Sequence, residues 1–434
     1  MTAYLAEYAW LNGAVARNVH IEVTDGQITA VNPEKSGEGG GERLPGLVLP
    51  GLANAHSHAF HRALRGNTHG QDSFWTWRDL MYQVAATLDP DRYYRLARAV
   101  YAEMALAGIT AVGEFHYLHH QPDGTPYADP NAMGHALIAA AQDAGIRITL
   151  LDTLYLTAGV DGRPLDGVQR RFGDQTPERW AGRVAELTAA PHAIIGSAIH
   201  SVRGVPARHL GEVTGHGPLH LHLSEQPAEN EQCRSIHGCT PTELLDRHGV
   251  LGPHTTAVHA THLTAHDIKL LGGSGTGVCL CPTTERDLAD GIGPARELAD
   301  AGSPLSLGSD SHAVIDMFEE LRGLEMNERL ATRRRGRFST AELITAAAAH
   351  ESLGWTDAGA IAPGHRADLV CVRLDSPRTA GVDPAGAVYA ATAADITHVI
   401  ADGRLIVADS QHSTVDTPRE LTAAIRELTG TDRP

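Results

Sequence analysis

Eight short apolar segments along the middle of the chain constrain its fold more than any other feature. Most are separated by enough residues for a helix. The expected strands lie at residues 47–49, 110–113, 148–151, 194–198, 219–223, 256–258, 278–280 and 305–308. Strands that alternate with helices form parallel sheets covered by helices, either as a doubly wound open sheet or as a (β/α)8 barrel. Most of these strands run directly into His, Glu, Asp or Arg, which favours the barrel, because barrel enzymes carry their catalytic residues at the carboxyl ends of strands.

The two ends of the chain have a different pattern, with strands joined by tight turns. Residues 3–33 contain the hairpin signal Asp25-Gly26, and residues 396–407 contain a second one, Asp402-Gly403. We therefore expect a TIM-like (β/α)8 barrel, an α/β fold, over residues 51–361. Residues 1–50 and 362–434 are expected to form a small β-sandwich domain that includes a C-terminal helix.

The charge balance excludes several classes of partner. The 434 residues contain 35 Lys and Arg against 52 Asp and Glu, a formal net charge of −17. Nucleic-acid binding depends on clustered positive charge, so this chain is a poor candidate for it.

No apolar run is long enough to span a membrane. Five cysteines without zinc-ribbon spacing, together with an N-terminus unlike a signal peptide, predict a cytoplasmic protein without a disulfide framework.

Histidines and carboxylates gather where the predicted strands end. His56 and His58 form an H-x-H pair that presents two imidazoles on one side of an extended chain. His222 lies at the end of the fifth strand, and Asp310 follows the eighth. Three histidines and one carboxylate leave a coordination position open for water, which is typical of a catalytic metal site. We expect one divalent metal ion there.

Several neighbours of these residues remain to be assigned. His220 shares a face with His222 but lies deeper in the strand, so we expect it to be packed. Glu225 lies just beyond the same strand, where a carboxylate can act on metal-bound water without binding the metal. His259 leaves the sixth strand first and is preferred to His262 as a site residue.

The lysine content argues against a second metal ion. A binuclear site bridged by a carboxylated lysine needs a lysine at a strand end. The only lysines are Lys35, beside a Gly-rich loop, and Lys269, in a helical stretch. The composition therefore favours a mononuclear site and leaves arginine as the main source of fixed positive charge.

The segments that contain these histidines and carboxylates resemble the amidohydrolase superfamily, in its mononuclear deaminase branch, and the resemblance covers essentially the whole chain. The H-x-H, H-x-x-E, H and D residues identify only the superfamily. The segments FWTWR (74–78), EFHY (114–117) and HSVR (200–203) are most similar to enzymes that deiminate N-formimino-L-glutamate in histidine degradation. The resemblance implies hydrolysis of a formimino group, which yields N-formyl-L-glutamate and ammonia.

The resemblance also implies a role for each site residue. The implied metal ligands are His56, His58, His222 and Asp310, with Zn²⁺ as the expected ion and Fe²⁺ as the alternative. The implied catalytic residues are Glu225, His259 and Asp310. The implied substrate-binding residues are His61, Arg78, Tyr117, His200 and Arg203. His61 departs from the family pattern, in which glutamine is expected; we still expect a substrate contact there.

A substrate with two carboxylates fits poorly with a net charge of −17. Recognition must then be local, and the planar guanidinium forks of Arg78 and Arg203 are the expected anchors. His119 and His120 are expected to be exposed loop residues. The resemblance further suggests a homodimer.

Two alternatives remain open at this point. One is another mononuclear deaminase of the superfamily, acting on guanine, cytosine, a triazine or an adenosine derivative; such an enzyme needs groups that hold a flat ring. The other is a non-catalytic scaffold that retains the barrel. Metal analysis and a test for ammonia release distinguish the scaffold from an enzyme.

Overall fold

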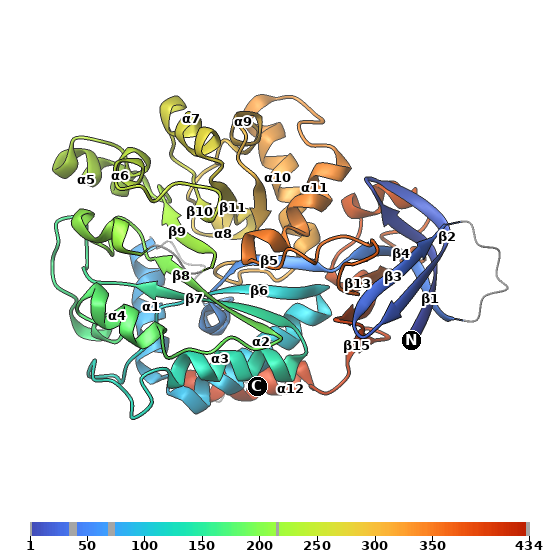
Figure 1. Cartoon of the computed structure of the whole chain (residues 1–434), viewed down its shortest axis with the longest axis horizontal. Helices are drawn as coiled ribbons and strands as arrows, with labels where there is room; N and C mark the ends of the chain where they lie inside the picture. The colour runs from blue at the N-terminus through green and yellow to red at the C-terminus, as the bar shows by residue number, and fades with distance from the viewer. Residues whose placement is uncertain (1, 34–40, 68–73, 214–216, 431–434) are drawn as a thin grey trace.

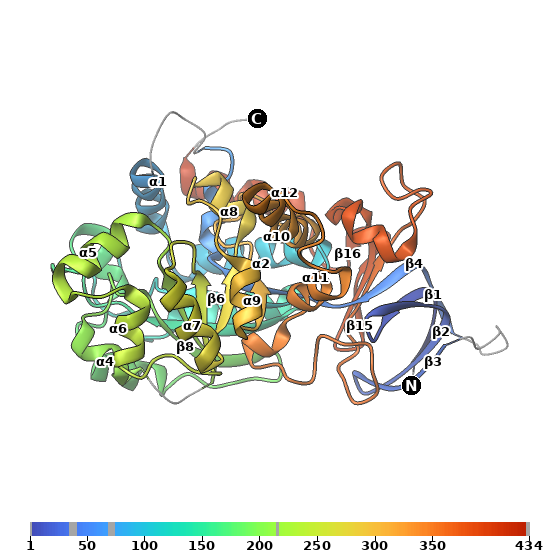
Figure 2. The ribbon, with the colours of Figure 1, turned by 90° about the horizontal axis from the view of Figure 1, so that it is seen from above.

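The computed structural model describes residues 2–33, 41–67, 74–213 and 217–430. It consists of a barrel of parallel strands surrounded by helices and a second sheet that lies at one end of the molecule (Figure 1). Seen from above, the helices lie around the barrel and the terminal sheet lies to one side of them (Figure 2). No helix among the described residues is long and apolar enough to cross a membrane.

The barrel strands follow one another in sequence order, and every neighbouring pair is parallel. They are β5 (Leu52–Ser57), β6 (Ile109–His116), β7 (Arg147–Leu154), β8 (Ala193–Ile199), β9 (Leu219–Leu223), β10 (Thr255–His259), β11 (Gly277–Leu280) and β12 (Leu305–Leu307). A parallel bridge between Ser57 and Asp310 joins the last strand's extension to the first strand. The expected (β/α)8 barrel is confirmed.

Helices cover the outside of the barrel. They are α1 (Phe74–Thr87), α2 (Pro90–Leu106), α3 (Ala132–Ala144), α4 (Pro177–Val184), α5 (Pro227–His237), α6 (Pro241–Arg247), α7 (Ala265–Ser274), α8 (Pro282–Asp287), α9 (Ala295–Ala301), α10 (Met317–Thr332), α11 (Thr340–Ala347) and α12 (Thr417–Thr429). Lys269 is exposed on α7, and Lys35 lies outside the described residues.

The first barrel strand differs from the prediction. Residues 47–49 belong to β4 (Glu42–Pro50) of the other sheet, and the barrel begins with β5 after Pro50 and Gly51. The two apolar segments are nearly continuous in sequence, and only the break at Pro50-Gly51 separates them. A Cβ on Gly51 would lie 2.4 Å from Thr110 Oγ1, so the chain passes from one sheet to the other where little space is left.

The second sheet contains strands from both termini, as expected. Its order is β16-β15-β14-β13-β4-β1-β2-β3, so β4 of the N-terminal part pairs with β13 (Leu369–Val372) of the C-terminal part. The other members are β1 (Thr2–Leu11), β2 (Ala14–Thr24), β3 (Gln27–Asn32), β14 (Ile396–Ala401), β15 (Arg404–Ala408) and β16 (Gln411–His412). Buried apolar residues from both parts form a core separate from that of the barrel.

Helix α12 was grouped with the terminal sheet by its place in the sequence, but it packs on the barrel helix α2. Arg95 and Arg98 of α2 form ion pairs with Glu427 and Glu420 of α12. Both segments lie along the lower edge in Figure 1. Leu421, Ala424 and Leu428 of α12 are buried in the same apolar cluster as residues of α2, so apolar packing holds the last helix on the barrel and the partly exposed ion pairs flank it.

Candidate metal and substrate site

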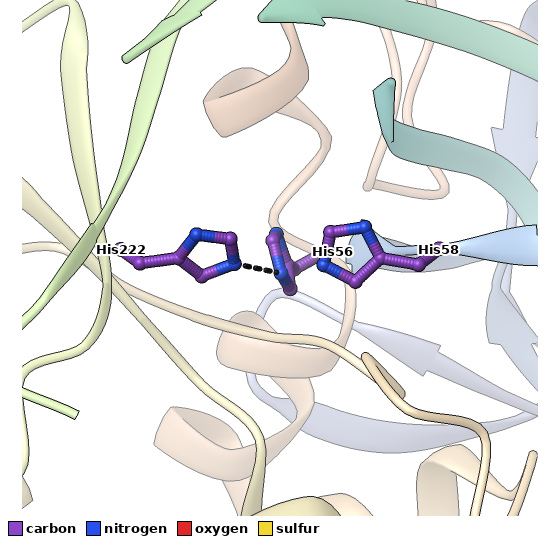
Figure 3. Close-up of side chains that lie close together, drawn as sticks. All are labelled: His56, His58 and His222. Carbon is purple, nitrogen blue, oxygen red and sulfur yellow. Dashed lines mark hydrogen bonds between the residues drawn. The ribbon is translucent and has the colours of Figure 1, made fainter. Parts of the chain in front are cut away.

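Four possible metal ligands meet at the carboxyl end of the barrel. His56 lies within β5 and His58 just after it, His222 lies in β9, and Asp310 follows β12. Asp310 Oδ1 lies 3.4 Å from Nε2 of both His56 and His58, and Nε2 of His56 lies 3.1 Å from Nε2 of His222. Figure 3 shows the three imidazoles pointing toward one another from opposite sides of the barrel.

Backbone carbonyls orient two of these rings. His58 Nδ1 donates to the carbonyl of Phe115 (3.0 Å), and His222 Nδ1 donates to the carbonyl of His200 (2.9 Å). Each bond leaves the lone pair of Nε2 directed into the site, which is how metal-binding histidines are usually held.

Burial keeps these imidazoles neutral. It lowers the pKa of His56 to about 3 and lowers the pKa of His58 and His222 as well. Burial alone would raise the pKa of Asp310, but the hydrogen bond with His56 and the charge of His259 lower it overall. Neutral imidazoles beside an ionised carboxylate are the forms that bind a divalent cation.

The donor set therefore fits a metal ion. Nε2 of His56 and Nε2 of His222 face each other at 3.1 Å, and Nε2 of His58 lies beside Asp310 Oδ1, so a cation between them would bind nitrogen lone pairs and a carboxylate oxygen together. His56, His58 and His222 form one group able to hold a metal, and His56, His259 and Asp310 form an overlapping one. Three nitrogens and a carboxylate oxygen suit zinc and iron(II) alike.

Glu225 and His259 lie beside these ligands. His259 Nε2 is 3.9 Å from Glu225 Oε1 and 3.7 Å from Asp310 Oδ2, while its Nδ1 is 3.5 Å from Glu285 Oε1. Burial opposes a charge on His259, but Glu225, Glu285 and Asp310 together raise its pKa to about 10. The site thus combines an imidazolium with a carboxylate that can accept a proton.

Three site residues or their neighbours have left-handed backbones. Ser224, His259 and Asp310 have φ values of 50°, 69° and 40°. Such conformations are uncommon for residues other than glycine, and they cluster at functional sites where surrounding contacts hold them. Here they end three strands abruptly and turn side chains into the barrel mouth.

The expected substrate-binding residues line the same cavity as the metal-site residues. Every predicted site residue except the fully buried His56 contributes to its wall. His61 Nε2 lies 3.0 Å from the hydroxyl of Tyr117, so the histidine that replaces the expected glutamine forms a hydrogen bond inside the cavity. His200 and Tyr155 pack edge to face, with ring centroids 4.2 Å apart. Arg78 reaches the cavity from α1 and Arg203 from the loop after β8.

A second histidine cluster lies outside this cavity, and the prediction for two of its members was wrong. His119 and His120 are buried, with exposed fractions of 1% and 3%. Arg171 covers their loop by accepting both backbone N–H groups at its carbonyl. His116, His119 and Asp152 lie close enough to hold a metal, but Arg183 already binds both oxygens of Asp152. A cation there would face the guanidinium at close range.

Three buried carboxylates near the site escaped the sequence analysis. Glu114 accepts from Ser57 Oγ (2.8 Å) and Ala59 N (2.7 Å), and burial raises its pKa to about 7. Glu285 accepts from Cys281 N and contacts His259. Glu229 contacts Arg203. All three contacts depend on tertiary structure, and Glu225 precedes α5, so no helical spacing connects Glu229 to it.

Comparisons with known proteins agree with this geometry. The model of the amidohydrolase family matches residues 47–406. Formimidoylglutamate deiminase of Pseudomonas aeruginosa is 38% identical over 95% of this chain and 96% of that protein. The 8-oxoguanine deaminase of the same organism is 31% identical over 84% of this chain and 82% of its own length.

A solved structure extends the agreement to the whole fold. The crystal structure of an amidohydrolase from Brucella melitensis superimposes with a TM-score of 0.91 at 32% identity, covering 99% of this chain and 100% of that one. The family match and these relatives span the barrel together with strands of the terminal sheet. The chain belongs to the amidohydrolase family and is a hydrolase that acts on carbon–nitrogen bonds.

Proposed function

We propose that this enzyme hydrolyses N-formimino-L-glutamate to N-formyl-L-glutamate and ammonia, as a step of histidine degradation. The observation that carries the proposal is that Arg78 and Arg203 line the same cavity as the metal-site residues and Glu225. Two guanidiniums at the mouth of an amidine-hydrolysing site suit a substrate with two carboxylates. The similarity to a formimidoylglutamate deiminase supports the same substrate.

The proposed ligands of the metal are His56, His58, His222 and Asp310, and zinc is the proposed ion. Such an ion lowers the pKa of a bound water to about 7 and thereby provides a nucleophile at neutral pH. His61, Tyr117 and His200 supply further hydrogen-bonding groups around the substrate.

The chain's own residues then handle the protons. Glu225 accepts a proton from the attacking water and delivers it to the imine nitrogen of the substrate, which leaves as ammonia. His259, charged beside Glu225 and Asp310, stabilises negative charge that develops at the tetrahedral carbon. Asp310 takes the second proton of the water and passes it to the same nitrogen as the C–N bond breaks, so that this nitrogen leaves with three hydrogens. Trp77, Tyr82, Tyr155 and Phe172 form an aromatic part of the wall of the same cavity.

The test is an ammonia-release panel on purified, zinc-loaded protein. We expect N-formimino-L-glutamate to be the preferred substrate, ahead of N-formimino-L-aspartate, with guanine, cytosine and 8-oxoguanine inactive. Preference for a flat ring contradicts the proposed substrate and favours a base deaminase, the activity named for the 8-oxoguanine relative. No ammonia from any amidine or base favours a non-catalytic scaffold.

We further propose that the enzyme is a cytoplasmic homodimer that binds neither nucleic acid nor membrane. The five cysteines are all free and buried, which suits a reducing compartment. The molar mass in solution, measured by light scattering, tests the dimer.

A further inference from the structure

The guanidinium of Arg203 in the substrate cavity contacts two carboxylates of the protein. Arg203 Nη2 lies 3.2 Å from Glu225 Oε2, and Arg203 Nε lies 3.2 Å from Glu229 Oε2. The same guanidinium proposed to bind a substrate carboxylate therefore contacts the proposed proton carrier in the free enzyme. A guanidinium has a limited number of N–H groups on its cavity side, so substrate and Glu225 compete for it.

The two carboxylates differ in their surroundings. The side chain of Glu229 is fully buried, whereas that of Glu225 is 9% exposed and lines the cavity. Glu229 also accepts from the backbone N–H of Ser224 (3.3 Å), and the Ser224 hydroxyl donates to Asn230 (2.8 Å). The first turn of α5 thus holds both Arg203 and the left-handed residue that precedes Glu225. Glu229 is therefore tied to the backbone before Glu225, whereas Glu225 shares the wall of the substrate cavity with Arg203.

We propose that Glu229 is a positioning residue that fixes Arg203, and that the carboxylate of the substrate displaces Glu225 from Arg203. In the free enzyme Arg203 holds Glu225 aside. When a carboxylate ligand binds, it takes the Nη2 side of the guanidinium, and Glu225 turns to the reacting water. A substrate carboxylate then binds Arg203 and at the same time frees Glu225 to act as the base. Carboxylate substrates are therefore favoured by activation of Glu225 as well as by their affinity for Arg203. The identity of the substrate in this inference rests on the proposed function, whereas the binding test below does not depend on it.

Binding of glutarate tests the competition without turnover. The probe is a dicarboxylate that cannot be hydrolysed, titrated calorimetrically into zinc-loaded protein. Glu225→Gln removes the competing charge, so we expect glutarate to bind about tenfold more tightly. Glu229→Gln removes the anchor of Arg203, so we expect binding about tenfold weaker. Simple removal of negative charge would strengthen binding in both variants, so the opposite signs identify the mechanism.

Two controls complete the test. Glu231→Gln makes the same substitution at an exposed position of α5, and we expect unchanged affinity. Thermal unfolding of each variant identifies any loss of folded protein. Equal or tighter glutarate binding in Glu229→Gln, or no gain in Glu225→Gln, overturns the proposal. An enzyme inactive on N-formimino-L-glutamate that still shows the opposite signs contradicts only the proposed function.

Kinetics of Glu229→Gln supply a second readout. With N-formimino-L-glutamate we expect KM to rise about tenfold while kcat changes less than threefold, because the anchor is weakened and the base is untouched. With N-methylformamidine, which has no carboxylate, we expect no change in KM. A fall in kcat alone, the same for both amidines, would indicate a merely structural role and contradict the proposal.

Discussion

Charge placement governs the chemistry at the scale of single residues. His56, His58 and His222 are neutral because they are buried, whereas His259 is charged because three carboxylates surround it. The same side chain is therefore neutral at the three positions proposed to bind the metal and an imidazolium at a fourth. The sequence analysis singled out all four from their places at or beyond the ends of apolar segments, but the charge of His259 also depends on Glu285, which nothing in the local sequence connects to it.

Substitution of Glu225 separates proton transfer from metal binding. We expect Glu225→Gln to lose between about 10²- and 10⁴-fold in turnover, the usual contribution of general acid–base catalysis, while its zinc content stays unchanged. Ammonia release and elemental analysis on the same preparation measure both. The matched control, Glu231→Gln, lies on the exposed side of α5 and should keep wild-type turnover. Near-wild-type activity in Glu225→Gln would exclude Glu225 as the proton carrier.

Removal of the metal should affect both activity and stability. His56, His222 and Asp310 belong to segments far apart in sequence, and a shared ion binds only the folded arrangement. Ligand at about a hundred times its Kd stabilises a protein by about 2.7 kcal/mol, so chelation should lower the melting temperature and abolish ammonia release. Stoichiometric zinc should restore both. Unchanged melting after verified removal of metal would argue against a shared site at these strand ends.

At the scale of elements, the positions of strands were more predictable than their partners. Seven barrel strands lie where apolar segments predicted them, but residues 47–49 pair with β13 instead. Strand pairing between distant segments leaves no local signal, and neither does the cover over His119 and His120, which comes from Arg171. The packing of α12 on α2, more than three hundred residues earlier in the chain, leaves no local signal either.

A buried ion pair joins the barrel to the terminal sheet. Arg147, at the start of β7, pairs with Asp368 beside β13 and with Asp402, at 2.8 Å, beside β14. The guanidinium also lies 5.1 Å from the ring of Trp355. Removing one partner of such a pair leaves an unpaired buried charge, which costs about 3–5 kcal/mol.

We therefore expect Arg147→Met to lower the free energy of unfolding by about 3–5 kcal/mol, and Arg147→Met with Asp368→Asn to recover part of the loss. Urea denaturation measures both. Arg163→Met, which breaks the exposed pair with Asp161, is the control and should change stability by less than about 1 kcal/mol. A loss in Arg147→Met no larger than in the control would contradict the role assigned to this pair.

The same pair predicts a pH dependence. Burial alone would raise the pKa of Asp368, but Arg147 lowers it to about 2, below the unfolded value of about 3.9. A lowered pKa contributes stability above the unfolded value, and this contribution is lost as the pH falls toward the folded value. The stability difference between the wild type and the double variant should therefore shrink between about pH 4 and pH 2. A difference that stays constant over this range would contradict the assignment.

At the scale of the whole molecule, net charge and local charge act in opposite directions. The net charge of −17 repels an anion at long range, while Arg78 and Arg203 attract it inside the cavity. Salt screens distant charges first: the Debye length falls from about 30 Å at 0.01 M to about 8 Å at 0.15 M ionic strength. Contacts within the buried cavity are screened much less. Added salt should thus weaken the repulsion more than the binding.

From this difference we expect kcat/KM for N-formimino-L-glutamate to rise about two- to threefold between 0.01 and 0.15 M ionic strength, since screening of a surface potential changes association rates. N-methylformamidine is a cation near neutral pH, so its kcat/KM should fall over the same range. The two amidines share the reacting group. Opposite signs in the salt dependence of their kcat/KM would therefore come from diffusion of the substrate to the site and not from the chemical step. A fall for both would mean that the arginines, rather than the molecular surface, dominate the approach of the anion.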